Sequence, residues 1–235
     1  MNILPIINQS SPLSWVLILV TVLCAYFIGS INFSIILSRA ISGKDIRESG
    51  SGNAGATNML RTHGKGMGVL TLLLDVLKGV VAVLIAMLVI ELSSRTGAEL
   101  YNAMCQASLT YLSGLFVIIG HNFPVFFSFK GGKGVATALG VVMMLNWKIG
   151  IVVLVIAITI MAVTRYVSLG SIIAAALFVV LDVSYMFFLD KWNIAEVICV
   201  VLMGAIIVLR HHANIKRLMT GTENKLGAKK KEQSE

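Results

Sequence analysis

Apolar runs of membrane length constrain this chain more than any other feature. Several of them approach or exceed the ~20 residues that an α-helix needs to cross ~30 Å of hydrocarbon. Only 13% of the residues are charged, compared with about 25% in a typical soluble domain. The sequence therefore predicts an all-α polytopic integral membrane protein with a single membrane domain over residues 1–235. Its helical core is expected over 13–210 and a basic tail over 211–235.

About seven transmembrane helices account for the apolar runs. The fourth is short for a full crossing, so it either crosses at a tilt or inserts only partly. If it did not cross, six spans would remain and the C-terminus would change sides. The predicted helices cover residues 13–38, 68–92, 103–120, 133–146, 148–164, 168–189 and 193–210.

The distribution of lysine and arginine predicts the orientation of these helices. With the N-terminus outside, only Arg95, Lys148 and Lys191 of the 19 basic residues fall in outer loops, and Lys78 falls within a helix. All the others lie in inner loops or the tail, in agreement with the positive-inside rule. We therefore expect the C-terminus and three polar, glycine-containing loops to face the cytoplasm together. The net charge of +8 then reflects topology, and no nucleic-acid partner is expected.

The first inner loop has the composition of a phosphate-binding segment. Residues 49–58 are almost all small or hydrogen-bonding, and their glycines let the backbone approach a ligand and expose its N–H groups. Ser51 and Asn53 add neutral donors, and Arg61 can bind a phosphate through two hydrogen bonds. The alternative is a flexible linker with an incidental arginine. A Walker A loop is excluded because neither Lys65 nor Lys133 is followed by Ser or Thr.

The second and third inner loops offer similar groups. A glycine-rich turn that includes Gly132 precedes the fourth helix. It would aim backbone N–H groups and the positive helix end at an anion, with Lys133 as the counter-charge. A membrane re-entry with snorkelling lysines is the alternative. The third turn contains Ser168 and Ser171 beside Arg165, which is also an ordinary composition for a membrane interface.

Two further pairs of polar residues are spaced three apart. His211 and Asn214 share a face if the last helix continues, and would then supply a proton acceptor and a polar group together. The alternative for His211 is that it only complements the helix dipole. Asp75 and Lys78 lie inside the second helix, where unpaired charges are costly, so we expect them to pair. No HxxxH pattern occurs, and the 11 carboxylates are dispersed, so no metal ion is expected.

Four motifs in a fixed order give the chain a family resemblance. They read SGNxGATNxxR, GHxFPxFFxFKGGKGVAT, RYxSLGS and HxxNIKRLxxGxE, between about Gly29 and Glu223. In this order they resemble the bacterial acyl-phosphate:glycerol-3-phosphate acyltransferases. The resemblance implies an enzyme of the bacterial inner membrane that acylates the 1-hydroxyl of glycerol 3-phosphate from acyl phosphate. The products would be lysophosphatidic acid and inorganic phosphate, in the first acylation of phospholipid synthesis.

The resemblance also implies roles for individual residues. On this basis we expect His211 and Asn214 at the reacting centre, and Ser51, Arg61, Lys133 and Ser168 on the phosphorylated substrates. Ser51 is also counted with His211 and Asn214 as a candidate catalytic residue. From the loops themselves we add Asn53, Gly132 and Ser171 as substrate-binding residues. Glu223, Asp75 and Lys78 are expected to be structural.

An acyl phosphate is already activated, so positioning and charge neutralisation are the main requirements and no cofactor is expected, neither a metal ion nor coenzyme A. The expected partners are the two substrates, the lipid bilayer and, functionally, the enzyme that makes acyl phosphate. Direct attack by the glycerol hydroxyl is favoured over an acyl-Ser51 intermediate, because no base can be assigned to Ser51. The base for direct attack is either His211 or a substrate phosphate.

Two other classes of function fit parts of the sequence. Basic loops and glycine-rich broken helices also suit a transporter of an organic phosphate. Against this, the charges collect on one face instead of at the midplane, and the two halves of the chain do not match. The third class is a structural or regulatory membrane subunit, in which the phosphate-binding composition would be incidental.

Overall fold

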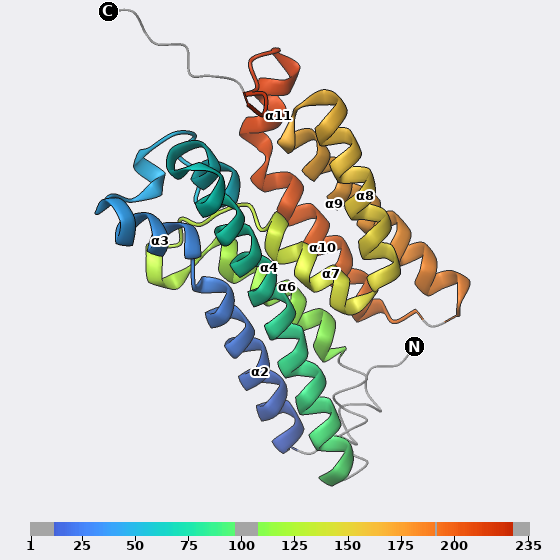
Figure 1. Ribbon diagram of the computed structural model, residues 1–235. Coiled ribbons are helices and arrows are strands. Elements are labelled where there is room, and N and C mark those ends of the chain that lie inside the picture. Colours follow the sequence, from blue (N-terminus) through green and yellow to red (C-terminus); the bar gives the residue numbers. More distant parts are fainter. Residues whose placement is uncertain (1–11, 97–107, 191, 228–235) are drawn as a thin grey trace, which may run out of the picture.

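The computed structural model describes residues 12–96, 108–190 and 192–227. Over these ranges the chain is a bundle of helices without strands (Figure 1). Residues 103–107 of one predicted span, together with Lys191 and the tail lysines 229–231, lie outside the described residues. The α-helices are α2 (Pro12–Ser30), α3 (Phe33–Ser42), α4 (Ala56–Thr96), α6 (Leu109–Asn122), α7 (Val135–Leu145), α8 (Trp147–Thr164), α9 (Val167–Phe188), α10 (Ile194–Arg210) and α11 (His212–Met219), with the 3-10 turns η1 (Ile46–Glu48) and η2 (Val125–Phe127).

Five stretches of helix in the described part of the chain are long and apolar enough to cross a membrane. The pair α10 and α11, bent by 55°, makes a sixth if it is one span. The predicted fourth span is the short apolar helix α7, with 11 residues. At 1.5 Å per residue such a helix falls well short of ~30 Å. Its shortness is confirmed, while the count of seven crossings and the orientation of the termini stay predictions.

The prediction of one continuous helix over 13–38 is wrong, because the helix breaks after Ser30. Asn32 caps the new helix α3: its side-chain oxygen accepts hydrogen bonds from the backbone N–H of Ile35 at 3.2 Å and from Ser34 Oγ at 2.7 Å. A cap of this kind satisfies helix-end N–H groups that would otherwise be left in an apolar environment. The break is hidden in the sequence because the few small and polar residues around Asn32 lie between two apolar stretches without a proline or a charge.

The end of α2, before the break, is held by the buried pair Asp75 and Lys78 in α4. Lys78 Nζ lies 2.9 Å from Asp75 Oδ1, which confirms the predicted pairing. The same ammonium group donates to the carbonyl oxygens of Gly29 at 3.1 Å and Ile31 at 2.9 Å. The Gly29 carbonyl belongs to the last turn of α2 and that of Ile31 follows the helix end, where carbonyls lack helical partners. Lys78 therefore serves as a cap supplied from a neighbouring helix.

Helix α4 begins inside the predicted first loop. Its first turns, residues 56–63, are separated from the membrane-length part by Gly64, which has φ 85° and ψ 179°. Few L side chains adopt this φ, so glycine suits the kink. The apolar periodicity starts only beyond the kink, which is why the sequence predicted a helix from residue 68. As a result Thr57 and Arg61 lie on a helical turn instead of in a loop.

Two glycines allow α4 and α7 to pack closely. A Cβ on Gly79 would fall on the carbonyl oxygen of Thr137, and one on Gly140 would fall on that of Val76. Small residues at such crossings let helix backbones approach each other in membrane proteins. The contact places the start of α7 beside α4.

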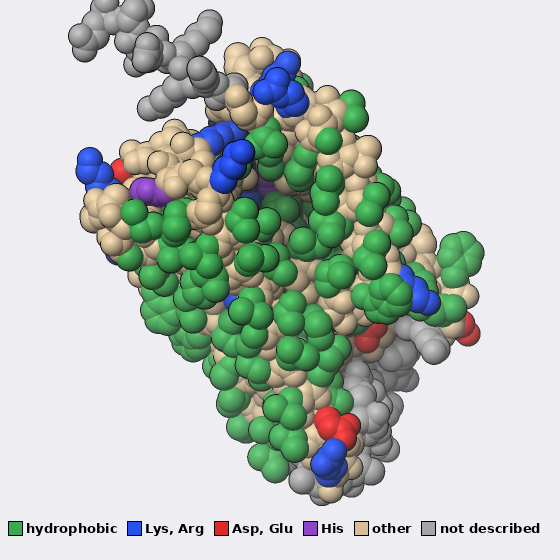
Figure 2. Space-filling model, in the orientation of Figure 1, with side chains coloured by type: hydrophobic (Ala, Val, Ile, Leu, Met, Phe, Trp, Pro, Cys, Tyr) green, Lys and Arg blue, Asp and Glu red, His purple; other side chains and the backbone are tan. Residues whose placement is uncertain are grey.

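The surface is divided between apolar sides and a polar end. Figure 2 shows hydrophobic side chains over the sides of the bundle, and a group of Lys and Arg side chains at the end that carries α3 and α11. Leu73, Val180 and Leu209 are each at least 60% exposed. Such exposure suits a lipid environment, where the apolar side chains of a helix face hydrocarbon.

Candidate active site

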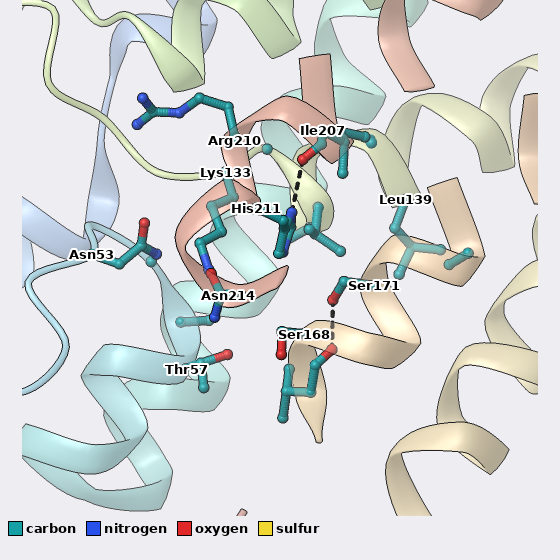
Figure 3. A pocket seen from close by; sticks show the side chains of 18 of the residues that line it. Asn53, Thr57, Lys133, Leu139, Ser168, Ser171, Ile207, Arg210, His211 and Asn214 are labelled. Carbon is teal, nitrogen blue, oxygen red and sulfur yellow. Dashed lines mark hydrogen bonds between the residues drawn. The ribbon is translucent and has the colours of Figure 1, made fainter. Parts of the chain in front are cut away.

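A cavity of about 670 Å³ lies at the polar end of the bundle and extends between the helices (Figure 3). Its polar lining includes Ser51, Asn53, Thr57, Arg61, Asp75, His121, Lys133, Ser168, Ser171, Arg210, His211, Asn214, Arg217 and Glu223. Its apolar lining includes Leu72, Leu139, Val142, Val153, Leu154, Ile158 and Phe178. The cavity thus joins a cationic polar region to an apolar one.

Residues 130–134, called here the lysine loop, bring a cation to the start of α7. Lys133 Nζ donates a hydrogen bond to Asn214 Oδ1, and the two side chains meet in the cavity (Figure 3). Gly134, with φ 81°, is the N-cap residue of α7 and provides no side-chain cap. Gly134, Val135 and Ala136 also line the cavity. The positive end of α7 and the lysine together suit an anion.

The first part of the lysine loop faces inward. The N–H of Gly131 donates to the carbonyl oxygen of Asn122, and that of Gly132 to the carbonyl oxygen of His121, both at 3.2 Å. These two N–H groups are therefore engaged, contrary to the prediction that the whole turn aims them at a ligand. Gly132 packs behind the cavity, and a Cβ there would fall on His121 Nε2 and on the carbonyl oxygen of Ala54.

Glu223 is the centre of a hydrogen-bond network that reaches Lys133 through Asn214. Its Oε1 accepts from Ser168 Oγ at 2.9 Å and from Asn214 Nδ2 at 2.7 Å. Its Oε2 accepts from Arg217 Nε at 2.7 Å. Burial opposes ionisation, but these hydrogen bonds hold the pKa of Glu223 below its ordinary value. A carboxylate thus orients Ser168 and Asn214, which fits the structural role predicted for it.

The segment after α11 returns to the bundle to deliver Glu223. Leu226 exchanges hydrogen bonds with Arg165: its N–H donates to the Arg165 carbonyl oxygen at 2.7 Å, and its carbonyl oxygen accepts from Arg165 Nη2 at 2.8 Å. Arg165 lies in the turn between α8 and α9. The beginning of the predicted basic tail is therefore part of the site.

His211 lies at the bend between α10 and α11. Its Nδ1 is 2.7 Å from the carbonyl oxygen of Ile207. Because a carbonyl only accepts, Nδ1 carries the hydrogen, and Nε2 of the neutral ring keeps a free lone pair. Burial, assisted by the charge of Lys133, lowers the pKa of His211 to about 4. At neutral pH this imidazole can accept a proton in the cavity.

Burial also lowers the pKa of Lys133, to about 8. Glu223 opposes this shift, and the positive charges of Arg217, Arg61 and Arg210 add to it. A second charge of opposite sign placed beside Lys133 would favour its protonated form. With three arginines and one carboxylate acting on it, Lys133 has positively charged surroundings, as expected where a phosphate binds.

Asn58 shapes the first loop from inside. Its Nδ2 donates to the carbonyl oxygens of Ile46 at 3.1 Å and Ser49 at 2.9 Å. Its Oδ1 accepts from the backbone N–H of Ser51 at 2.9 Å. Asn58 is buried, so it holds the loop while Ser51 and Asn53 face the cavity.

Comparison with known proteins identifies the family. Residues 19–221 match the family model described as Glycerol-3-phosphate acyltransferase. The chain belongs to this family. The glycerol-3-phosphate acyltransferase of Clostridioides difficile (strain 630) is 44% identical over 207 residues, covering 88% of this chain and 94% of that protein. That of Thermoanaerobacter pseudethanolicus (strain ATCC 33223 / 39E) is 42% identical over 210 residues, covering 89% and 96%.

Solved structures agree with the family. The crystal structure of PlsY (YgiH), an integral membrane glycerol 3-phosphate acyltransferase, in its glycerol 3-phosphate form, matches with a TM-score of 0.75 and 37% identity, covering 89% of this chain and 96% of that chain. The lysophosphatidic acid form matches with a TM-score of 0.71 and 36% identity, covering 89% and 95%. The chain is thus an integral membrane acyltransferase, which decides against the transporter and the non-enzymatic subunit.

In this acyltransferase the cavity brings together most of the residues singled out from the sequence. Gly132 and Lys78 do not line it and lie behind it, whereas Asp75 does line it. The sequence predictions missed Arg217, although it lies three residues after Asn214 on α11 and helical spacing points to it. They also treated Arg210 only as a topology charge. Its Nε and Nη2 donate to the carbonyl oxygen of Gly132 at 3.2 and 3.1 Å.

Proposed function

We propose that this acyltransferase transfers a fatty acyl group from acyl phosphate to the 1-hydroxyl of glycerol 3-phosphate, giving lysophosphatidic acid and inorganic phosphate. The observation that carries the proposal is one cavity with a cationic end and an apolar end, which suits two phosphates and an acyl chain. The names of the relatives support the acceptor, and the ligands of the two PlsY forms support acceptor and product. The basic end of the bundle supports a site on the cytoplasmic face of the bacterial inner membrane.

The substrates are assigned to the cavity by their chemistry. Arg61 and Lys133 neutralise phosphate, and Ser168 adds a hydroxyl group. Ser51, Asn53 and Ser171 stand along the same polar lining. The acyl chain lies along the apolar lining, near Leu139 and Phe178, because burial there removes methylene groups from water.

The transfer is a direct substitution at the acyl carbonyl. The glycerol oxygen attacks the carbonyl carbon, an ester bond forms, and the bond from that carbon to the phosphate oxygen breaks. Phosphate leaves with the electron pair, and Arg61 stabilises its charge, while Lys133 holds the phosphate of glycerol 3-phosphate. Asn214 Nδ2 is already bonded to Glu223. The N–H groups at the start of α7 are therefore better placed than Asn214 to stabilise the oxyanion.

The hydroxyl proton has two possible acceptors. One is His211, whose Nε2 keeps a free lone pair and which lines the cavity. The other is a phosphate of a substrate. Neither route requires an acylated Ser51. Incubation of the protein with radiolabelled acyl phosphate alone, followed by denaturation, should leave no label on the chain; stable label lost in Ser51→Ala would establish the covalent route.

The experiment that tests the reaction uses purified protein, radiolabelled glycerol 3-phosphate and either palmitoyl phosphate or palmitoyl coenzyme A, without added metal. We expect labelled lysophosphatidic acid from palmitoyl phosphate only. Arg61→Ala and His211→Ala should sharply reduce it. Lys65→Ala is the matched control, because Lys65 is an exposed cation near Arg61 that does not line the cavity. Product from palmitoyl coenzyme A and none from palmitoyl phosphate would refute the proposed donor. No product from folded wild-type protein with either donor would refute the proposed reaction.

A further inference from the structure

The carbonyl oxygens of the lysine loop are held by two arginines from distant parts of the chain. Arg47 Nη1 donates to the carbonyl oxygens of Phe127 at 3.0 Å and Lys130 at 2.9 Å. Arg210 Nη2 donates to those of Gly131 at 3.2 Å and Gly132 at 3.1 Å. One guanidinium therefore holds the entry to the loop and the other holds its middle.

Arg47 is itself fixed by Asp45. Its Nε and Nη2 donate to the two carboxylate oxygens at 2.9 and 2.8 Å, a two-point arrangement that sets the plane of the guanidinium. Asp45 is buried, and the hydrogen bond from Arg47 is the main cause that lowers its pKa to about 2. Arg39 Nη2 also donates to Asp45 Oδ2, at 2.7 Å. The fixed guanidinium leaves Nη1 aimed at the loop.

The lysine loop requires such support from outside. Three of its five residues are glycine, which leaves the backbone many accessible conformations. Its inward N–H groups are bonded to the carbonyls at the end of α6, and the two arginines take its carbonyls on other sides. The loop is thus held along its backbone while Lys133 extends into the cavity. Arg47 belongs to η1, just before the first loop, and Arg210 directly precedes His211.

We propose that Arg47 and Arg210 are positioning residues for acyl transfer, which hold the lysine loop by its carbonyl oxygens and so keep Lys133 Nζ in place for the substrate phosphate. This assignment rests on the proposed function, in which Lys133 binds the phosphate of glycerol 3-phosphate. Its consequence is therefore an effect on the affinity for that substrate. Arg47 lies outside the cavity lining, whereas Arg210 lines it, and the role assigned to both is their hold on the loop carbonyls. The first loop, the lysine loop and the α10–α11 bend are thereby linked into one frame.

The first test compares Arg47→Lys with Arg39→Lys. Lysine keeps the charge but cannot make the planar contacts to Asp45 and two carbonyls at once. We expect Arg47→Lys to raise the KM for glycerol 3-phosphate about tenfold or more, with a smaller effect on kcat. Arg39→Lys is the matched control, because Arg39 also binds Asp45 but, among the described residues, donates no hydrogen bond to the lysine loop. Its contact on that side is with the Phe127 ring of η2, at 5.8 Å. Its KM should change less than about twofold.

A double-mutant cycle separates positioning from general loss of stability. In a Lys133→Met background, Arg47→Lys should add little further loss, because the group it positions is already absent. Binding of labelled glycerol 3-phosphate in detergent replaces KM for any variant too slow to assay, and melting temperatures report stability. Effects that add fully in the double variant, or equal effects of Arg47→Lys and Arg39→Lys, would overturn the proposal.

Two further variants keep the test informative if Arg47→Lys does not fold. Asp45→Asn weakens the orientation of Arg47, and Arg210→Lys removes the paired contacts to Gly131 and Gly132. Both should raise the same KM and lose their effect in the Lys133→Met background. An unchanged KM in both would contradict the positioning role. Wild-type protein that makes no lysophosphatidic acid would instead refute the proposed function, so the two failures are distinguishable.

Discussion

Asn214 Nδ2 donates a 2.7 Å hydrogen bond to Glu223 Oε1, and this contact turns the carbonyl side of the Asn214 amide toward Lys133. Two residues from the same short segment thus determine how the principal cation of the site is held. The orientation depends on Glu223 being ionised, because a carboxylate accepts hydrogen bonds without donating any.

Replacing Glu223 with glutamine should therefore reduce kcat/KM for glycerol 3-phosphate by roughly tenfold or more, since charged hydrogen bonds are worth ~1.5–3 kcal/mol. The amide would leave Arg217 without its counter-charge and let the Asn214 side chain rotate. The matched change is Glu91→Gln, whose exposed carboxylate pairs with Arg95. Steady-state kinetics of both variants decide the question, and equal activities would show that Glu223 does not orient the site.

The affinity for glycerol 3-phosphate should fall as pH rises through about 8. Burial lowers the pKa of Lys133 to about 8, so the cation that attracts phosphate is lost above this pH. A phosphate monoester is already doubly charged there, because its second pKa is ≈ 6. The charged groups that act on Lys133 are Glu223, Arg217, Arg61 and Arg210.

This pH dependence is measured as KM between pH 6.5 and 9. In Lys133→Arg the charge persists over the whole range, because arginine stays protonated. The rise in KM should then disappear, even if the absolute affinity is weaker. The same rise in both proteins would assign it to another group.

His211 should remain neutral well below the usual range for histidine. Its pKa is lowered to about 4 by burial and by Lys133, so the unprotonated Nε2 persists as pH falls from 7 to 5. If His211 is the base, kcat should not decline with a midpoint near 6.5, and His211→Ala should lower kcat by 10²–10⁴-fold, the range typical of general bases. A kcat midpoint near 6.5 in the wild type that vanishes in His211→Gln would contradict the lowered pKa.

The helices could be predicted where long apolar runs end at polar turns. The predicted spans 148–164, 168–189 and 193–210 agree with α8, α9 and α10 within one residue at either end. Periodicity could not reveal the break at Asn32, because Ser30, Asn32 and Ser34 are small or short polar residues within a mainly apolar run and can belong to one continuous helix. The deciding partner, Lys78, lies on another helix.

The candidate site was predictable as a set of residues and less so as a network. Glycines, hydroxyls and cations in three loops indicated phosphate chemistry, and the positive-inside pattern placed the loops together. What spacing could not give is which backbone groups are already used. The N–H groups of Gly131 and Gly132 are bonded to the end of α6, and Arg47 reaches a loop 80 residues away. Such contacts depend on tertiary packing.

The buried pair Asp75 and Lys78 should contribute to stability in an asymmetric way. Removing one partner of a buried ion pair leaves an uncompensated charge and costs ~3–5 kcal/mol. Lys78→Met also leaves the carbonyls of Gly29 and Ile31 without their donor, so it should destabilise more than Asp75→Asn. The double variant should be more stable than Lys78→Met alone, because it also removes the carboxylate that Lys78→Met leaves with only His121 beside it, at 3.6 Å. Unfolding midpoints of the two single variants and the double variant are compared in one detergent. If the loss of stability in the double variant equals the sum of the losses in the single variants, the two charges are not coupled.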